Sequence, residues 1–269
     1  MIRKTVVAGQ FYPGSKDELS IEIKSLLGKA AHDIDAIGAV SPHAGYIYSG
    51  HVAGRVFASM KLKSAYIIMG PNHTGLGEPF GIDTSDSWKT PLGETRIDTA
   101  LAEKIKKNCK YITADSLSHA HEHSIEVQLP FLQFLQKDFK FVPITISHAG
   151  IDIYREIGAA IAKSIKEAEL EKDVTIIASS DMTHYESRES ARKKDFAAIN
   201  AILALDEEML AGSVSSLDIS MCGCAPVAIM IASAKALGAK EARLVKYQTS
   251  GDVSGDYSSV VGYAGMVIK

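Results

Sequence analysis

The stretch AYIIMGPNH, residues 65–73, joins an apolar run to a proline and a histidine. The run at 65–70 is typical of a strand that is buried on both faces. Proline fixes φ and has no N–H to donate, so it ends strand pairing and directs the side chains that follow it out of the sheet. The sequence therefore predicts that His73 lies just beyond the carboxyl end of a buried strand.

Similar apolar runs recur along the chain, and amphipathic segments separate them. We expect further strands at 36–40, 141–147, 174–179, 242–247 and 259–268. Apolar residues at helical spacing predict helices at 16–28, 50–60, 98–107, 122–136, 152–168, 188–204 and 226–237. This alternation predicts an α/β fold in which a central, largely parallel or mixed sheet carries helices on both faces.

Residues 76–96 interrupt the alternation of strand and helix. They combine turn residues with a two-residue period, which predicts a hairpin rather than a second domain. No linker, internal repeat or low-complexity segment divides the chain, so one domain over 1–269 is expected. Residues 249–259 are expected to form a flexible loop before the last strand.

Histidines follow four of the predicted strands. The side chains placed at these strand ends are His43, His73, His148, and Asp181 with His184. Ligands of open α/β sheets bind in the crevice outside the carboxyl ends of the strands. One loop histidine is more often a surface or structural residue, but four at corresponding positions indicate a site if their strands are neighbours. The 30-residue spacing of His43 and His73 is compatible with one βα unit that makes their strands neighbours.

Two cysteines precede the predicted helix at 226–237. A helix N-terminus favours thiolate, so we expect a lowered pKa for Cys222. The alternative for both residues is apolar packing, and for Cys224 we favour it. Cys109 is expected to be structural. Three cysteines in a chain of 269 residues do not form a disulfide framework, which favours a reducing compartment.

Two imidazoles and one thiolate suit iron, zinc or copper and do not suit magnesium or calcium. A second cluster of chelating side chains occurs in HAHEHSIE, residues 119–126. Two interpretations of it stay open. It is either a helix start, in which Glu122 favours the dipole, or a segment that turns Glu122 or His123 toward the same crevice.

Composition excludes several other classes of function. The net charge of −3, without a run of Lys or Arg, argues against nucleic acid as a partner. The apolar stretches are shorter than the roughly 20 residues that span a bilayer, and the N-terminus lacks a signal-peptide pattern, so we expect a cytoplasmic protein with no membrane partner. No GxSxG, Walker A or GxGxxG motif supports hydrolysis by a serine or nucleotide binding.

Six ordered motifs together resemble the Memo family, also called AmmeMemoRadiSam system protein B. They are PHAGYIYSG, GPNHTG, HEHSIEVQLPFLQ, VPITIS, SSDMTHY and CGCAP, and the likeness runs from AGQFYPGS to SVVGYAGMVI. Members of the family are similar in fold to class III extradiol dioxygenases, which are non-haem iron enzymes. The resemblance thus implies a dioxygenase-like α/β fold and a pathway companion of the radical-SAM type.

The resemblance also assigns residues to a site. His43, His73 and Cys222 match the family's proposed metal ligands. Asp181 and His184 match pocket residues, with His184 near the position of a catalytic histidine in the dioxygenases, and Glu122 and His123 match an EHS element. The dioxygenases complete their iron site with a carboxylate, and here a thiolate stands in its place, which places ring cleavage in doubt.

These observations predict an iron-dependent oxidoreductase of unknown substrate, with copper or zinc as the alternative metals. His43, His73 and Cys222 would hold the metal, and His184, oriented by Asp181, would move protons. The competing hypothesis is a non-catalytic module that binds a peptide or phosphopeptide in the same crevice, because a fold does not imply a function.

Overall fold

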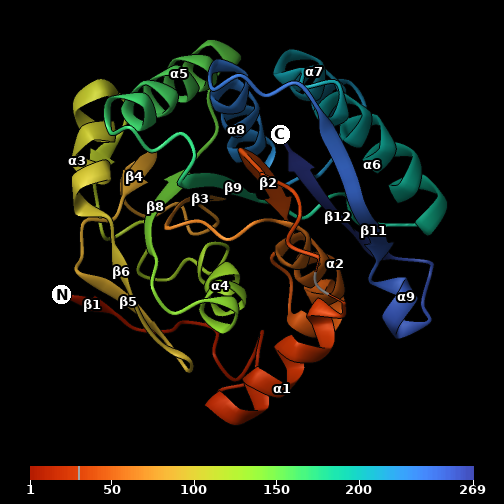
Figure 1. Cartoon of the computed structure of the whole chain (residues 1–269). Coiled ribbons are helices and arrows are strands. Elements are labelled where there is room, and N and C mark those ends of the chain that lie inside the picture. The colour runs from red at the N-terminus through yellow and green to blue at the C-terminus, as the bar shows by residue number, and fades with distance from the viewer. Residues whose placement is uncertain (30) are drawn as a thin grey trace.

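The computed structural model describes residues 1–29 and 31–269. Within these residues, twelve strands form one mixed sheet, with helices on both of its sides (Figure 1). The strands are β1 (Ile2–Arg3), β2 (Gly38–Ser41), β3 (Ala65–Pro71), β4 (Phe80–Ile82), β5 (Ser87–Thr90), β6 (Gly93–Ile97), β7 (Thr113–Ala114), β8 (Lys140–Ile146), β9 (Val174–Ser179), β10 (His184–Glu186), β11 (Ala242–Thr249) and β12 (Val260–Ile268).

Nine α-helices and one 3₁₀ helix lie in the described ranges. They are α1 (Lys16–Leu27), α2 (Tyr46–Ser59), α3 (Thr99–Asn108), η1 (Glu126–Gln128), α4 (Leu129–Leu135), α5 (Ile151–Glu167), α6 (Arg188–Leu203), α7 (Glu207–Ser216), α8 (Cys224–Ala236) and α9 (Gly251–Ser254). No helix of this part of the chain combines the length and apolar character needed to cross a bilayer.

The strand order is β1-β5-β6-β8-β3-β9-β2-β12-β10, with β11 beside β12 and β4 beside β7 and β8. The five central strands from β6 to β2 are parallel, while β12, β11 and β10 extend the sheet in antiparallel fashion. Because the central strands run the same way, their carboxyl ends share one edge. The predicted α/β fold with a mixed sheet is confirmed.

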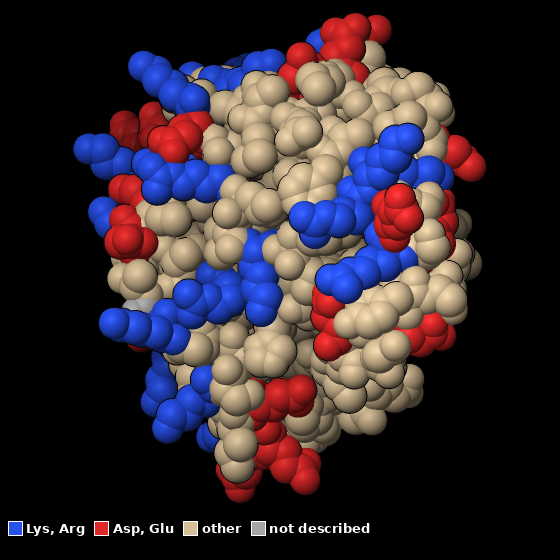
Figure 2. All heavy atoms as spheres, turned by 90° about the vertical axis from the view of Figure 1, so that its right-hand side faces the viewer, with Lys and Arg blue, Asp and Glu red and all other residues tan. Residues whose placement is uncertain are grey.

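Alternate residues of the central strands enter two separate cores. On β3, Ile67 and Met69 pack into the core that α3, α5, α6, α7 and α8 cover, whereas Tyr66 and Ile68 pack toward α1, α2 and α4. Burial on both faces explains why these strands read as continuous apolar runs. α6, α9 and β11 form one side of the molecule, where Lys and Arg side chains lie with acidic side chains between them (Figure 2).

Several expectations need correction. β2 and β3 are not neighbours, because β9 pairs with both and lies between them. The helix expected at 122–136 begins only at Glu126, with η1 followed by α4, because Glu122 and His123 lie outside regular structure and Ser124 and Ile125 form a turn. Residues 249–259 are not simply a loop, because they contain α9.

The hairpin expected at 76–96 is present as the antiparallel pair β5–β6. It joins the main sheet where β6 pairs with β8, so this excursion does not build a separate domain. Sequence reasoning missed α7, which begins after Asp206, a residue that caps the helix by accepting from the N–H groups of Glu208 and Met209.

Candidate metal centre

The structure brings His43, His73 and Cys222 together at the carboxyl edge of the parallel strands. His43 follows β2, His73 follows β3, and Cys222 lies just before α8. Their ligand atoms all lie within 4.8 Å of one another, and His43 Nε2 is 3.3 Å from Cys222 Sγ. Nitrogen and sulfur donors at about 2.1 and 2.3 Å from one tetrahedral ion would be about 3.6 Å apart. The three side chains therefore suit a common metal ion.

His43 is almost completely buried and is held from two directions. Its backbone N–H donates to Asp181 Oδ1 at 2.8 Å, and its ring Nδ1 lies 2.9 Å from the Ser179 hydroxyl. Burial, together with the charges of His73 and His123, holds the pKa of His43 well below its ordinary value. Its imidazole is therefore neutral near pH 7, as metal binding requires.

Glu122 lies behind His73 and is fully buried. One carboxylate oxygen, Oε2, accepts from the His73 backbone N–H at 2.7 Å. The other, Oε1, lies 3.0 Å from His73 Nδ1 and accepts from the backbone N–H groups of His123 and Ser124. A carboxylate behind a ligating histidine fixes the orientation of the ring and leaves Nε2 for the metal.

The same contacts shift the pKa values of both residues. Burial alone raises the pKa of Glu122, but the hydrogen bond and charge of His73 and the Ser124 N–H lower it to about 2. Burial likewise lowers the pKa of His73, and the hydrogen bond and charge of Glu122 outweigh it and raise that pKa. Glu122 is therefore ionised near pH 7, and four N–H groups surround its carboxylate.

His123 adds a third imidazole to the cluster. Its ring stacks on His73 with centroids 5.0 Å apart and meets the ring of His43 edge-on at 5.5 Å. Phe11 from the N-terminal segment covers another side of it at 4.8 Å. Burial lowers the pKa of His123, so this ring is neutral near pH 7 and able to accept a proton.

The expected lowering of the Cys222 pKa is wrong. Burial of the thiol and the negative charge of Asp181 raise its pKa well above the ordinary value. The residue lies two positions before Cys224, the first residue of α8, and desolvation outweighs any effect of the helix dipole. A bound cation would reverse this balance, because metal coordination deprotonates a thiol.

Asp181 and His184 flank the cluster but do not form the expected pair. The His184 backbone N–H donates to the Ser220 hydroxyl at 2.7 Å, and its Nδ1 lies 3.0 Å from the Ser220 carbonyl oxygen. Asp181 instead accepts from the backbone of His43. The prediction that Asp181 orients His184 is therefore wrong, because Ser220 performs that role.

The other two cysteines lie away from the cluster. Cys224 and Cys109 are both buried in the core on the α5–α8 side of the sheet, as expected for packing residues. Burial raises the pKa of Cys224 to about 11, so it remains a thiol.

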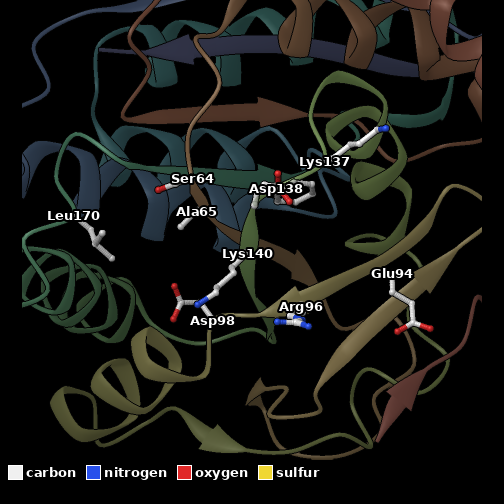
Figure 3. A pocket seen from close by; sticks show the side chains of 10 residues that line it. Ser64, Ala65, Glu94, Arg96, Asp98, Lys137, Asp138, Lys140 and Leu170 are labelled. Carbon is white, nitrogen blue, oxygen red and sulfur yellow. The ribbon is translucent and has the colours of Figure 1, made fainter.

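A hollow of about 370 Å³ opens beside two of the candidate ligands. Its lining residues are Pro71, Asn72, His73, Ile146, Ser147, His148, Cys222 and Ala225. The exposed His148 thus shares a cavity with His73 and Cys222, although it is not among the clustered ligand atoms. A larger cavity, of about 640 Å³, lies at the opposite edge of the sheet, where Ala65 and Lys140 begin β3 and β8 (Figure 3).

Sequence reasoning missed the buried polar residues behind His43, namely Ser179 and Gln128. Ser179 ends a predicted strand and is the first residue of the motif SSDMTHY, so its position was a usable signal. Gln128 lies in a segment with helical spacing, where a glutamine is ordinarily a solvent-facing residue, and its complete burial could not be read from the sequence.

The fold and the cluster together define an α/β protein with a candidate metal centre at the carboxyl edge of its sheet. The family described as Memo-like protein matches residues 3–267. The chain is 45% identical over 288 residues to a MEMO1 family protein of Methanococcus maripaludis strain C5, with 100% of both chains covered. It is 41% identical over 268 residues to a MEMO1 family protein of Aquifex aeolicus, with 99% of this chain and 98% of that one covered. The chain therefore belongs to the Memo family, as its motifs indicated.

The fold is also similar to that of a solved structure titled as the crystal structure of uncharacterized protein JW3007 from Escherichia coli K12. The TM-score is 0.58, with 86% of this chain and 98% of that chain covered. At 13% sequence identity, the likeness shows a shared fold alone.

Proposed function

We propose that this protein is a metal-dependent oxidoreductase and that His43, His73 and Cys222 hold its metal ion. Iron is the metal that we favour. The observation that carries the proposal is the convergence of three ligand atoms from three separate segments to within 4.8 Å. Copper and zinc remain the alternatives, since the same donor set suits them. Three protein ligands leave coordination positions open for a substrate.

The metal would supply electron transfer or activation of a bound small molecule, and the chain's own residues would do the rest. Glu122 holds the His73 ring, and Asp181 holds the backbone of His43. The neutral His123 ring lies beside the rings of His43 and His73, where it is placed to accept a proton from a bound substrate. His184, held by Ser220 at the start of β10, is a second candidate for proton transfer.

The hollow beside the ligands favours a small-molecule substrate over a phosphopeptide. Its volume of about 370 Å³ lies in the range of small-molecule sites. Within the described chain, its lining includes neither Lys nor Arg, the side chains that recognise phosphate groups. A small, uncharged or weakly polar molecule therefore suits this cavity better than a phosphorylated peptide does.

Anaerobic purification followed by metal analysis tests the proposal. We expect about one iron per chain in the wild type and loss of iron in His43→Ala and Cys222→Ala, because each substitution removes one of three ligands. Cys224→Ala is the matched control, since it removes a thiol from the core outside the cluster. Full iron content in the His43→Ala and Cys222→Ala variants would exclude these ligands.

A further inference from the structure

Behind His43, on the side away from Cys222, lies a buried hydrogen-bond network. Ser179, at the end of β9, and Gln128, at the end of η1, are both fully buried. The Ser179 hydroxyl contacts three groups: the His43 ring at Nδ1 (2.9 Å), the Gln128 side-chain amide at Nε2 (2.8 Å) and the Ser124 carbonyl oxygen (2.7 Å). Each partner restricts where the few protons of this network can lie.

The orientation of the Gln128 amide is determined by its other neighbours. Its Nε2 lies 2.9 Å from the Pro42 carbonyl oxygen, which can only accept. Its Oε1 accepts from the Ser41 hydroxyl at 2.8 Å. The nitrogen of Gln128 therefore faces Ser179 and donates to it.

The Ser179 hydroxyl has one proton, and only one of its neighbours can be the acceptor for it. The Ser124 carbonyl oxygen has no proton to give, so Ser179 donates to it. The two lone pairs of the hydroxyl then accept from Gln128 and from His43. Because the hydroxyl can only accept from the ring, His43 Nδ1 must carry a proton.

We propose that Ser179 and Gln128 are positioning residues that select the Nδ1–H tautomer of His43 and so present Nε2 as a free lone pair toward Cys222. The Nε2 atom is the one that lies 3.3 Å from Cys222 Sγ. Gln128 also binds the carbonyl of Pro42, the residue before His43, so the network holds both the ring and the adjoining backbone. This inference rests on the proposed metal function. It adds how the His43 ring is oriented and protonated so that its Nε2 can bind the metal.

The rings of His43 and His73 are thus oriented by different hydrogen-bonding groups. A buried carboxylate, Glu122, supports His73, whereas a neutral hydroxyl and a neutral amide support His43. A neutral acceptor orients the ring without adding a further negative charge to that of Asp181 beside the Cys222 thiolate that a metal would require.

Nitrogen NMR of the histidine rings tests the tautomer directly in the metal-free protein. We expect the His43 ring, assigned from the signals that disappear in His43→Gln, to be protonated at Nδ1 and unprotonated at Nε2. In Ser179→Ala we expect a mixture of the two tautomers, because the acceptor for Nδ1–H is gone. A wild-type ring that carries its proton on Nε2 would overturn the proposal.

Cobalt(II) titration, followed by absorption of the bound ion, supplies the second readout. We expect the dissociation constant to rise about 10- to 100-fold in Ser179→Ala and in Gln128→Met. Ser233→Ala is the matched control, since it removes an equally buried hydroxyl from α8, where it bonds only the Ile229 carbonyl. Equal dissociation constants for Ser179→Ala and Ser233→Ala would overturn the positioning role.

Two outcomes separate this inference from the function on which it rests. If the wild type takes up no cobalt, the metal proposal fails, and the NMR result still decides the tautomer. If Ser179→Ala does not fold, as judged by urea unfolding, Gln128→Met decides in its place. It keeps the Ser179 hydroxyl and removes the amide that donates to Ser179 and Pro42 and accepts from Ser41.

Discussion

Gly223 separates Cys222 from α8, and it allows the cysteine segment to approach the end of β9. A Cβ atom at this position would lie 2.4 Å from the Ser179 carbonyl oxygen and equally close to Ser180 Cβ. The Gly223 N–H donates to the Ser180 hydroxyl at 3.1 Å. The glycine is therefore required by close contact, and its φ of −97° demands nothing unusual of the backbone.

We expect Gly223→Ala to destabilise the protein by about 1–3 kcal/mol, as overpacking does, and to weaken metal binding by displacing Cys222. Gly212→Ala is the control, because apart from the adjoining residues and the backbone of α7 itself, no described atom lies within 4 Å of its added Cβ. In the α7 interior, that change should stabilise by about 0.5–1 kcal/mol. Urea unfolding measures both, and equal effects of the two variants would contradict the role of Gly223.

We expect the buried His119 to make the free energy of unfolding depend on pH. Its Nε2 lies 2.9 Å from the Gly81 carbonyl oxygen, and its ring meets Trp88 edge-on. Burial lowers its pKa to about 4, below the ordinary value of 6.5. The unfolded chain therefore binds the proton more readily than the folded chain does.

The stability that neutral His119 contributes is complete above pH 6.5 and declines as the pH falls toward 4. We expect the wild type to lose on the order of 2 kcal/mol from this residue between pH 7 and pH 4.5. His119→Gln, which has no such titration, should show a smaller decline. Urea midpoints at the two pH values check this, and identical declines would rule it out.

The N-terminal segment forms hydrogen bonds and an ion pair with the segment that contains Glu122 and η1. Arg3, in β1, pairs with Glu126 of η1 at 2.7 Å and donates to the carbonyl oxygen of Glu122. Glu126 is fully buried and also accepts from Tyr12 and from backbone N–H groups. This contact joins two elements more than 100 residues apart.

We expect Arg3→Met to destabilise the protein by about 3 kcal/mol, because it leaves the buried Glu126 without its cation. Arg188→Met, which breaks the half-exposed pair with Asp252, should cost below about 1 kcal/mol. Urea unfolding of both variants measures the difference. A cost for Arg3→Met as small as that for Arg188→Met would show that the backbone donors alone satisfy Glu126.

Metal binding should stabilise the whole molecule, because the three ligands come from segments that only folding brings together. At a free metal concentration of 100 times Kd, the free energy of unfolding should increase by about 2.7 kcal/mol, which corresponds to a rise in Tm of about 5 °C. We expect no such rise in His43→Ala. Calorimetry with and without metal measures this, and an equal rise in both proteins would place the metal elsewhere.

The parallel strands and the imidazoles at their ends were predictable from local sequence. The run at 65–70 is apolar on both faces because β3 lies between two cores, and Pro71 ends it just before His73. Such features depend on residues that are neighbours along the chain. The α/β class, the motif positions and the candidate ligands follow from them.

The contacts across the sheet could not be predicted in the same way. β9 lies between β2 and β3, and this order brings Ser179 behind His43 and Gly223 against the end of β9. Likewise, Asp181 binds the backbone of His43 rather than the ring of His184. These pairings join residues about 40 to 140 positions apart. Strand order and packing select them, whereas local patterns carry information only about near neighbours.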